Sequence, residues 1–284
     1  MKKLHDYTDL TRFNRPIGAL LLMWPTLWAL WLAADGWPQW HLIVIFVLGV
    51  FSMRSAGCII NDYADRNIDG HVDRTKNRPL PSGRVSKKEA LGLFTLLVLL
   101  SFVLILFTDW RTVLLSIGGL GLAVLYPFIK RYTHLPQLFL GLAFSWAIPM
   151  AYSAEGGDLL DPQLWMLFLA NCLWTIAYDT YYAMTDRPDD IKIGVKSTAI
   201  LFGQYDLLMI LCLQALTLSL LLWIGALGHL HWPYFVSILI AIGLFYMQFN
   251  KAKDRAYLPC FQAFLENNRV GYCIFIGLVA SYLV

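Results

Sequence analysis

Long apolar stretches separated by short polar ones dominate this chain of 284 residues. Apolar residues follow one another without the helical spacing of an amphipathic surface helix or the alternation of a half-buried strand. Stretches of about 18 or more such residues are typical of membrane-spanning helices. The pattern therefore predicts an all-α, polytopic membrane protein with nine transmembrane helices. The spans are expected at residues 16–34, 41–60, 90–107, 112–129, 136–153, 163–183, 207–227, 232–249 and 268–284.

The composition agrees with a membrane protein. Hydrophobic residues make up 58% of the chain and charged residues only 14%, whereas a soluble domain carries about a quarter charged residues. A transmembrane β-barrel would show alternating segments of about ten residues, and the sequence has none. We expect a single domain over residues 1–284, surrounded by the lipid bilayer. The net charge of +3 is too small to indicate a nucleic-acid partner.

Lys and Arg residues are distributed unevenly between the connecting segments. Basic loops remain in the cytoplasm, so this distribution predicts a cytoplasmic N-terminus and, with nine spans, a C-terminus on the other side. The long loops 61–89 and 184–206 then lie in the cytoplasm. Apart from Arg111, no Lys or Arg occurs in the connections near 35–40, 108–111, 154–162 and 228–231.

Each long cytoplasmic loop begins with a cluster of acidic residues. In the first cluster, Asn61, Asp65 and Asp69 are spaced four residues apart. A helix that continues through them would carry all three on one face. The matching position of a second cluster about 120 residues later hints at an internal duplication.

The second cluster follows the sixth predicted span. Asp179, Asp186 and Asp190 stand at i, i+7 and i+11, which again is one face of a helix. Pro188 is a helix-breaking residue within this stretch. The sequence therefore does not decide whether the last turn of the second cluster is helical.

Several carboxylates on one helix face repel one another unless a cation compensates them. Oxygen ligands of this kind suit Mg²⁺, which typically takes one or two carboxylates, waters and substrate phosphates. Two facing acidic stripes could therefore hold Mg²⁺ and a diphosphate between them. The alternative is that the acids are solvated loop residues paired with nearby Lys and Arg.

Cationic residues accompany the acids. Arg78 follows the first cluster, and Lys130 and Arg131 follow the fourth predicted span on the same side. Such cations would neutralise a departing phosphate, although the positive-inside bias also explains them. Arg54 lies within a span, about 10 Å deeper than Asn61. An intramembrane Arg is a functional or paired residue by default.

These motifs resemble the UbiA-type intramembrane aromatic prenyltransferases over nearly the whole chain. Paired acidic motifs with these flanking residues are far more specific than a lone NDxxD. The resemblance is carried by Asn61-Asp62-x-x-Asp65-x-x-x-Asp69, Tyr178-Asp179-x-x-Tyr182-Ala183-x-x-Asp186-x-x-Asp189-Asp190, Arg15-Pro16-Ile17-Gly18-Ala19, Arg54-Ser55-Ala56-Gly57-Cys58, Asn77-Arg78-Pro79-Leu80-Pro81-Ser82-Gly83 and Tyr126-Pro127-Phe128 before Lys130-Arg131-Tyr132-Thr133.

The resemblance implies a nine-helix bundle around a central cavity, closed by the cytoplasmic Asp-rich loops. It implies Mg²⁺-dependent transfer of a polyprenyl group from polyprenyl diphosphate to 4-hydroxybenzoate in ubiquinone biosynthesis, in the bacterial inner membrane. Asp65, Asp69, Asp186 and Asp190 are then expected to be catalytic. The expected metal ligands are Asn61, Asp65, Asp69, Asp186 and Asp190, and the expected substrate-binding residues are Arg54, Arg78, Lys130, Arg131, Asp179 and Tyr182.

Other functions remain open at this point. The acceptor could instead be a naphthoate, homogentisate, haem or a chlorophyllide. An ion-coupled transporter would also use intramembrane acids, but its site usually lies near the bilayer midplane, whereas these acids lie at one face. A CDP-alcohol phosphotransferase needs D-G-x-x-A-R, and Asp69-Gly70 is followed by Asp73, not Ala, before Arg74.

Overall fold

The computed structural model describes residues 2–66, 75–129 and 131–284. These ranges contain helices and no strand, which confirms the predicted all-α class. The helices are α1 (Lys2–Thr11), α2 (Ile17–Ala33), α3 (Trp40–Asp65), α4 (Lys87–Ile105), α5 (Trp110–Ile129), α6 (Pro136–Ser145), α7 (Ala147–Ala154), α8 (Pro162–Ile193), α9 (Thr198–Phe202), the 3₁₀ helix η2 (Gly203–Tyr205), α10 (Asp206–Leu227), α11 (Trp232–Ala252) and α12 (Tyr257–Ser281).

Each predicted span coincides with a helix or a helix pair among the described residues. The span predicted at 136–153 is interrupted at Trp146, where α6 ends and α7 begins. Helix α12 contains most of the span predicted at 268–284 and already begins at Tyr257. By length and composition, five helical stretches of the described chain can cross a bilayer, so the count of nine spans stays a prediction. Those five are Trp40–Asp65, Lys87–Ile105, Trp110–Ile129, Thr198–Leu227 and Trp232–Ala252.

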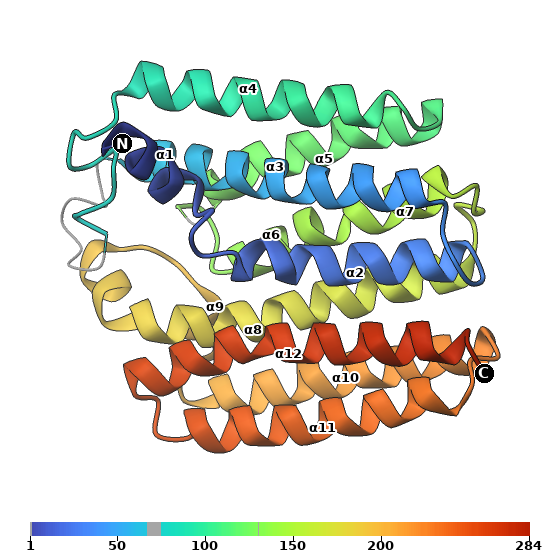
Figure 1. Ribbon diagram of the computed structural model, residues 1–284. Helices are drawn as coiled ribbons and strands as arrows, with labels where there is room; N and C mark the ends of the chain where they lie inside the picture. Colours follow the sequence, from blue (N-terminus) through green and yellow to red (C-terminus); the bar gives the residue numbers. More distant parts are fainter. Residues whose placement is uncertain (1, 67–74, 130) are drawn as a thin grey trace.

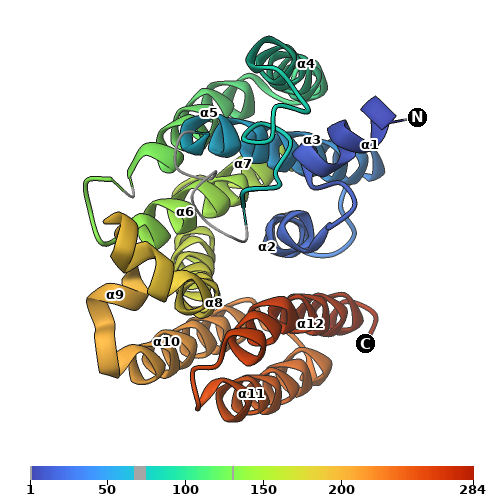
Figure 2. The same ribbon diagram turned by 90° about the vertical axis from the view of Figure 1, so that its left-hand side faces the viewer.

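The long helices lie side by side and run between two ends of the molecule (Figure 1). The short helices α1 and α9 lie at the end that holds the N-terminus, and the C-terminus lies at the other end (Figure 1). Viewed along the helices, α4 and α5 lie at one side of the bundle, and α10, α11 and α12 lie at the opposite side (Figure 2).

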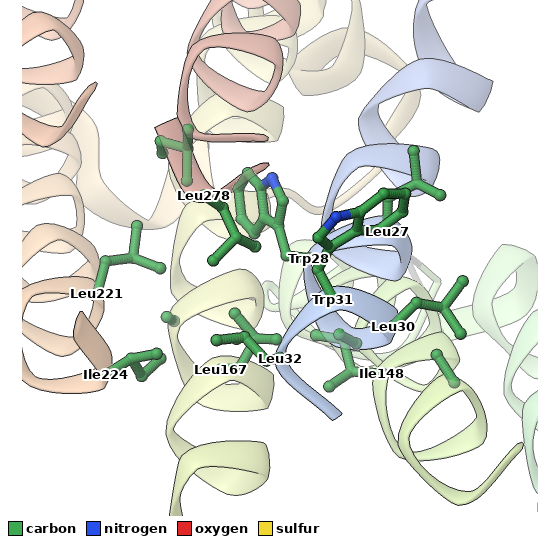
Figure 3. Close-up of a cluster of buried hydrophobic side chains, with 14 of the residues drawn as sticks. Leu27, Trp28, Leu30, Trp31, Leu32, Ile148, Leu167, Leu221, Ile224 and Leu278 are labelled. Atoms are coloured by element: carbon green, nitrogen blue, oxygen red, sulfur yellow. The ribbon is translucent and has the colours of Figure 1, made fainter. Parts of the chain in front are cut away.

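A large apolar core joins α2 to its neighbours. Trp28 and Trp31 of α2 are buried there with Ile148 of α7, Leu167 of α8 and Leu278 of α12 (Figure 3). Trp28 stacks on Trp174 of α8, with ring centroids 5.5 Å apart. This core connects α2, α7, α8 and α12, so it fixes the relative positions of helices that are far apart in the sequence.

Ion pairs join the segments that cap the N-terminal end of the bundle. Asp206, at the start of α10, is fully buried and accepts hydrogen bonds from Arg187 of α8 and from Arg255 between α11 and α12. The hydrogen bond to Asp206 raises the pKa of Arg255. On α1, Asp6 pairs with Arg84 at 2.6 Å, and Lys3 pairs with Glu89 of α4 at 2.7 Å.

Candidate active site

A cavity of about 1160 Å³ extends into the bundle from the end that carries the acidic motifs. Along α3 its wall runs from Ile45 to Asp65, a rise of roughly 30 Å at 1.5 Å per residue. The cavity therefore reaches across most of the thickness of a bilayer's hydrocarbon core. Its acidic lining is concentrated at the end near Asp65, and its deep lining is mostly apolar.

Helix α8 contributes one continuous polar stripe to this cavity. Asp179, Tyr182, Asp186 and Asp190 all line it, as the predicted common face requires. Pro188 does not end the helix, because α8 continues to Ile193. The helix ends instead at Gly194, whose φ of 73° is the left-handed conformation that favours glycine. The turn around Pro188 and Asp190, which the sequence did not decide, is therefore helical.

Helix α3 contributes an amide and a carboxylate to the same cavity. Asn61 and Asp65 both line the cavity, four residues apart at the end of α3. Asp65 is 2% exposed and so lies inside the wall. Asp69, predicted as a ligand and catalytic residue, lies outside the described residues. Three of the four acids predicted to be catalytic, Asp65, Asp186 and Asp190, are thus brought to one cavity from two helices.

These donors suit a magnesium ion chemically. They are carboxylate and amide oxygens, the ligands that Mg²⁺ prefers. Within residues 2–66, 75–129 and 131–284, however, no three His, Cys, Asp or Glu residues are grouped closely enough to hold a metal. A site that relies on substrate phosphates and water needs only one or two carboxylates at each ion. The residues therefore fit a metal that binds together with a phosphorylated substrate.

Arg54 lies deep in the same cavity, on α3. Its Nη1 donates a hydrogen bond to the Sγ of Cys58 at 2.8 Å, and its guanidinium lies 5.9 Å from the centre of the Phe144 ring. Its Nε is buried without a hydrogen-bond partner. Asp179 of α8 lines the same cavity. A positive group therefore lies below the acidic stripe, next to apolar walls.

The other cations predicted to bind substrate differ in whether they reach the cavity. Arg78 lines the cavity. Arg131 is exposed, is absent from the cavity lining, and donates to the backbone oxygen of Ala64 at 2.7 Å. Lys130 lies outside the described residues. Among the described cations of the prediction, Arg54 and Arg78 thus reach the cavity and Arg131 does not.

The buried ion group formed by Asp62 was not predicted from the sequence. This residue is 1% exposed and accepts two hydrogen bonds from Arg12, both at 2.9 Å, and one from Arg78 at 3.0 Å. Both arginines also line the cavity. Arg12 follows the short helix α1, which has no long apolar stretch and so left no signal in the hydropathy pattern. Asp62 therefore joins α3 to the segments that carry Arg12 and Arg78.

Apolar residues line the deep half of the cavity, between α3, α4, α5 and α7. Leu99 and Phe102 of α4 line it, and their side chains are 55% and 46% exposed. Leu120 of α5 and Met150 of α7 complete this part of the lining. The deep half therefore offers an apolar chain an apolar wall to pack against.

Fold and cavity together define a class: a multi-pass helical membrane protein whose cavity joins an acidic, cation-containing end to an apolar interior. Residues 22–276 match the UbiA prenyltransferase family. The chain belongs to that family. This membership favours prenyl transfer over the transporter and phosphotransferase alternatives.

Comparison with individual proteins agrees with this family assignment. The chain is 78% identical, over all 284 residues of both proteins, to a 4-hydroxybenzoate octaprenyltransferase of Marinomonas sp. (strain MWYL1). The fold is similar to that of a UbiA homolog from Aeropyrum pernix K1, with a TM-score of 0.81 at 24% identity, covering 92% of this chain and 97% of that one. A UbiA homolog from Archaeoglobus fulgidus bound to GPP and Mg²⁺ has a TM-score of 0.74 at 18% identity, covering 98% and 100%.

Proposed function

We propose that this chain, acting as a single domain, transfers a polyprenyl group from polyprenyl diphosphate to the ring carbon ortho to the hydroxyl of 4-hydroxybenzoate, in ubiquinone biosynthesis. The observation that carries the proposal is one cavity that joins acids from α3 and α8 to an apolar interior containing Arg54. The relative from Marinomonas is named for this acceptor and for an octaprenyl donor. Identity of 78% over the full length supports the same substrates here.

The acidic end would hold the diphosphate. Asn61, Asp65, Asp186 and Asp190 would bind Mg²⁺ there, together with Asp69, and Arg78 would bind a phosphate oxygen directly. When bound, Mg²⁺ would neutralise charge on the departing diphosphate and so ease its release. The protein's own contribution is to aim these groups at the leaving group before the reaction begins.

The reaction would then follow where the acidic end of the cavity meets its apolar part. The bond between the allylic carbon and the diphosphate oxygen breaks, and diphosphate leaves with the electron pair. The resulting allylic cation is attacked by the ring carbon, which afterwards loses its proton. Leu99, Phe102 and their neighbours would surround the prenyl chain, and their exclusion of water would keep the cation from being hydrolysed.

Arg54 is the residue that we assign to the carboxylate of 4-hydroxybenzoate. It lines the cavity, whereas Arg131 is exposed and bound to the backbone of α3. Arg54→Met should raise the KM for 4-hydroxybenzoate about tenfold or more, since a hydrogen bond to a charged group contributes about 1.5–3 kcal/mol. The KM for the prenyl donor should change little, and a neutral phenol such as 4-hydroxybenzamide should be affected less. If only Arg131→Met discriminated acid from amide, the assignment would pass to Arg131.

The chain is proposed to lie in the bacterial inner membrane with a cytoplasmic N-terminus, because the basic loops alternate along the sequence. Two exposed positions at opposite ends of the bundle test this orientation: Lys87 at the start of α4, and Leu160, which is 83% exposed. In sealed right-side-out vesicles, Leu160→Cys should react with a membrane-impermeant maleimide and Lys87→Cys should not. Inside-out vesicles should reverse the result, and the unsubstituted chain provides the labelling blank. Reaction of both variants from one side would refute this topology.

A membrane assay tests the function itself. Membranes that contain the chain should convert 4-hydroxybenzoate and octaprenyl diphosphate to the prenylated acid, with one diphosphate released for each product. EDTA should abolish the reaction and added Mg²⁺ should restore it. Product formation from a naphthoate or homogentisate but not from 4-hydroxybenzoate would show that the acceptor is wrongly assigned.

A further inference from the structure

We infer that Gly18 is a positioning residue for Arg54, and that the absence of a side chain at this position allows the guanidinium to lie where it can bind the acceptor. The inference rests on the proposed role of Arg54 as the carboxylate-binding residue. Gly18 belongs to the first turn of α2, Arg54 belongs to α3, and both line the cavity.

The space beside Gly18 is occupied by the arginine. A Cβ added at Gly18 would lie 2.7 Å from Nε, 2.7 Å from Nη2 and 3.0 Å from Cζ of Arg54. Contacts this short do not occur, so any side chain at position 18 would force the guanidinium to move. The edge of the guanidinium formed by Nε and Nη2 therefore packs directly against the backbone of α2.

The backbone conformation at position 18 does not require a glycine. Gly18 lies in a helix and is not one of the glycines with positive φ. Glycine within a helix is less favourable than alanine by about 1 kcal/mol. At a helical position with no need for unusual backbone angles, close approach of another group is the remaining use of a glycine. Here that group is Arg54.

Two further contacts complete this socket, which consists of Gly18, Cys58 and Phe144. Cys58, one helical turn from Arg54, accepts a hydrogen bond from Nη1 at 2.8 Å. The ring of Phe144, on α6, lies 5.9 Å from the guanidinium carbon, within the range of a cation–π interaction. The backbone of α2 thus packs against one edge of the guanidinium, Cys58 of α3 binds Nη1, and Phe144 of α6 lies beside the group. The position of the cation depends on all three.

Gly18→Ala tests the inference. It should raise the KM for 4-hydroxybenzoate about tenfold, leave the KM for octaprenyl diphosphate within about twofold, and affect 4-hydroxybenzamide less than the acid. A purely structural defect would not change the ratio between acid and amide. Gly243→Ala is the matched control, since Gly243 is an exposed helical glycine of α11, outside the cavity lining, and its added Cβ would meet nothing within 4 Å.

The double variant Gly18→Ala/Arg54→Met separates a role through Arg54 from any other role. Once Arg54 is gone, the alanine should cause no further rise in the KM for 4-hydroxybenzoate, because interacting residues are not additive. A further rise would overturn the inference. If Gly18→Ala behaved like Gly243→Ala while Arg54→Met still discriminated acid from amide, the inference alone would fail. If Arg54→Met did not discriminate, the proposed role of Arg54 would fail, and the inference with it.

Cys58→Ala provides a second test. Unlike Gly18→Ala, this variant adds no atoms beside Arg54 and so cannot displace it by steric overlap. It removes the sulfur that accepts from Nη1 and should raise the KM for the acid about twofold to threefold, again more than for the amide. An unchanged ratio between acid and amide in both Cys58→Ala and Gly18→Ala would show that the socket does not position the cation.

Discussion

Replacing Asp65 or Asp186 by asparagine is expected to lower kcat for prenyl transfer by about a hundredfold or more, while the protein remains folded in the membrane. The two residues line the same cavity from α3 and α8. Asparagine keeps the size of the side chain but removes the negative charge that a divalent cation needs. The loss should therefore appear at saturating concentrations of both substrates.

The measurement is initial rate against Mg²⁺ concentration in purified, detergent-solubilised protein. Each variant should need more Mg²⁺ than the parent for its residual rate. Asp254→Asn provides a control for the chemical change, since Asp254 is exposed in the segment between α11 and α12 and is not part of the cavity lining. A near-normal rate at limiting Mg²⁺ in either Asp65→Asn or Asp186→Asn would refute the proposed metal site.

Asp62→Ala should have its main effect on stability. Asp62 is 1% exposed and accepts hydrogen bonds from Arg12 and Arg78. Removing one partner of a buried ion group leaves the other charges uncompensated, which costs on the order of 3 kcal/mol. The midpoint of thermal unfolding should fall by several degrees, whereas the Mg²⁺ concentration needed for half-maximal rate should stay close to that of the parent.

Asp189→Asn is the matched control for this stability measurement. Asp189 pairs with Lys192, whose side chain is 72% exposed. Exposed ion pairs contribute less than about 1 kcal/mol, so this variant should unfold near the temperature of the parent. Equal midpoints for Asp62→Ala and Asp189→Asn would contradict the view that Asp62 holds Arg12 and Arg78 together.

The two experiments together distinguish adjacent acids of one motif. Asp65 is expected to act on the metal and diphosphate, and Asp62 is expected to support the cavity wall. Both residues line the cavity from α3, but Asp62 also binds Arg12 and Arg78, which lie outside that helix. The motif alone would not separate these roles.

Features that span only a few helical turns explain what could be predicted from the sequence. Nine apolar stretches indicated an all-helical membrane protein, since only helices of that length satisfy their own backbone in lipid. The spacing of Asp179, Asp186 and Asp190 predicted one face of a helix, and all three line the cavity. These properties depend on neighbours within a few turns of the same helix, so the sequence by itself determined them.

Contacts between residues far apart in the chain were decided by the tertiary structure alone. Arg12 meets Asp62 across 50 positions, and Gly18 meets Arg54 because α2 and α3 approach closely at that point. Arg54 and Arg131 were both predicted to bind substrate, yet packing directs Arg131 to the backbone of Ala64. Charge and spacing show which residues can carry the chemistry. Helix packing determines which of them share a cavity and which hold its walls.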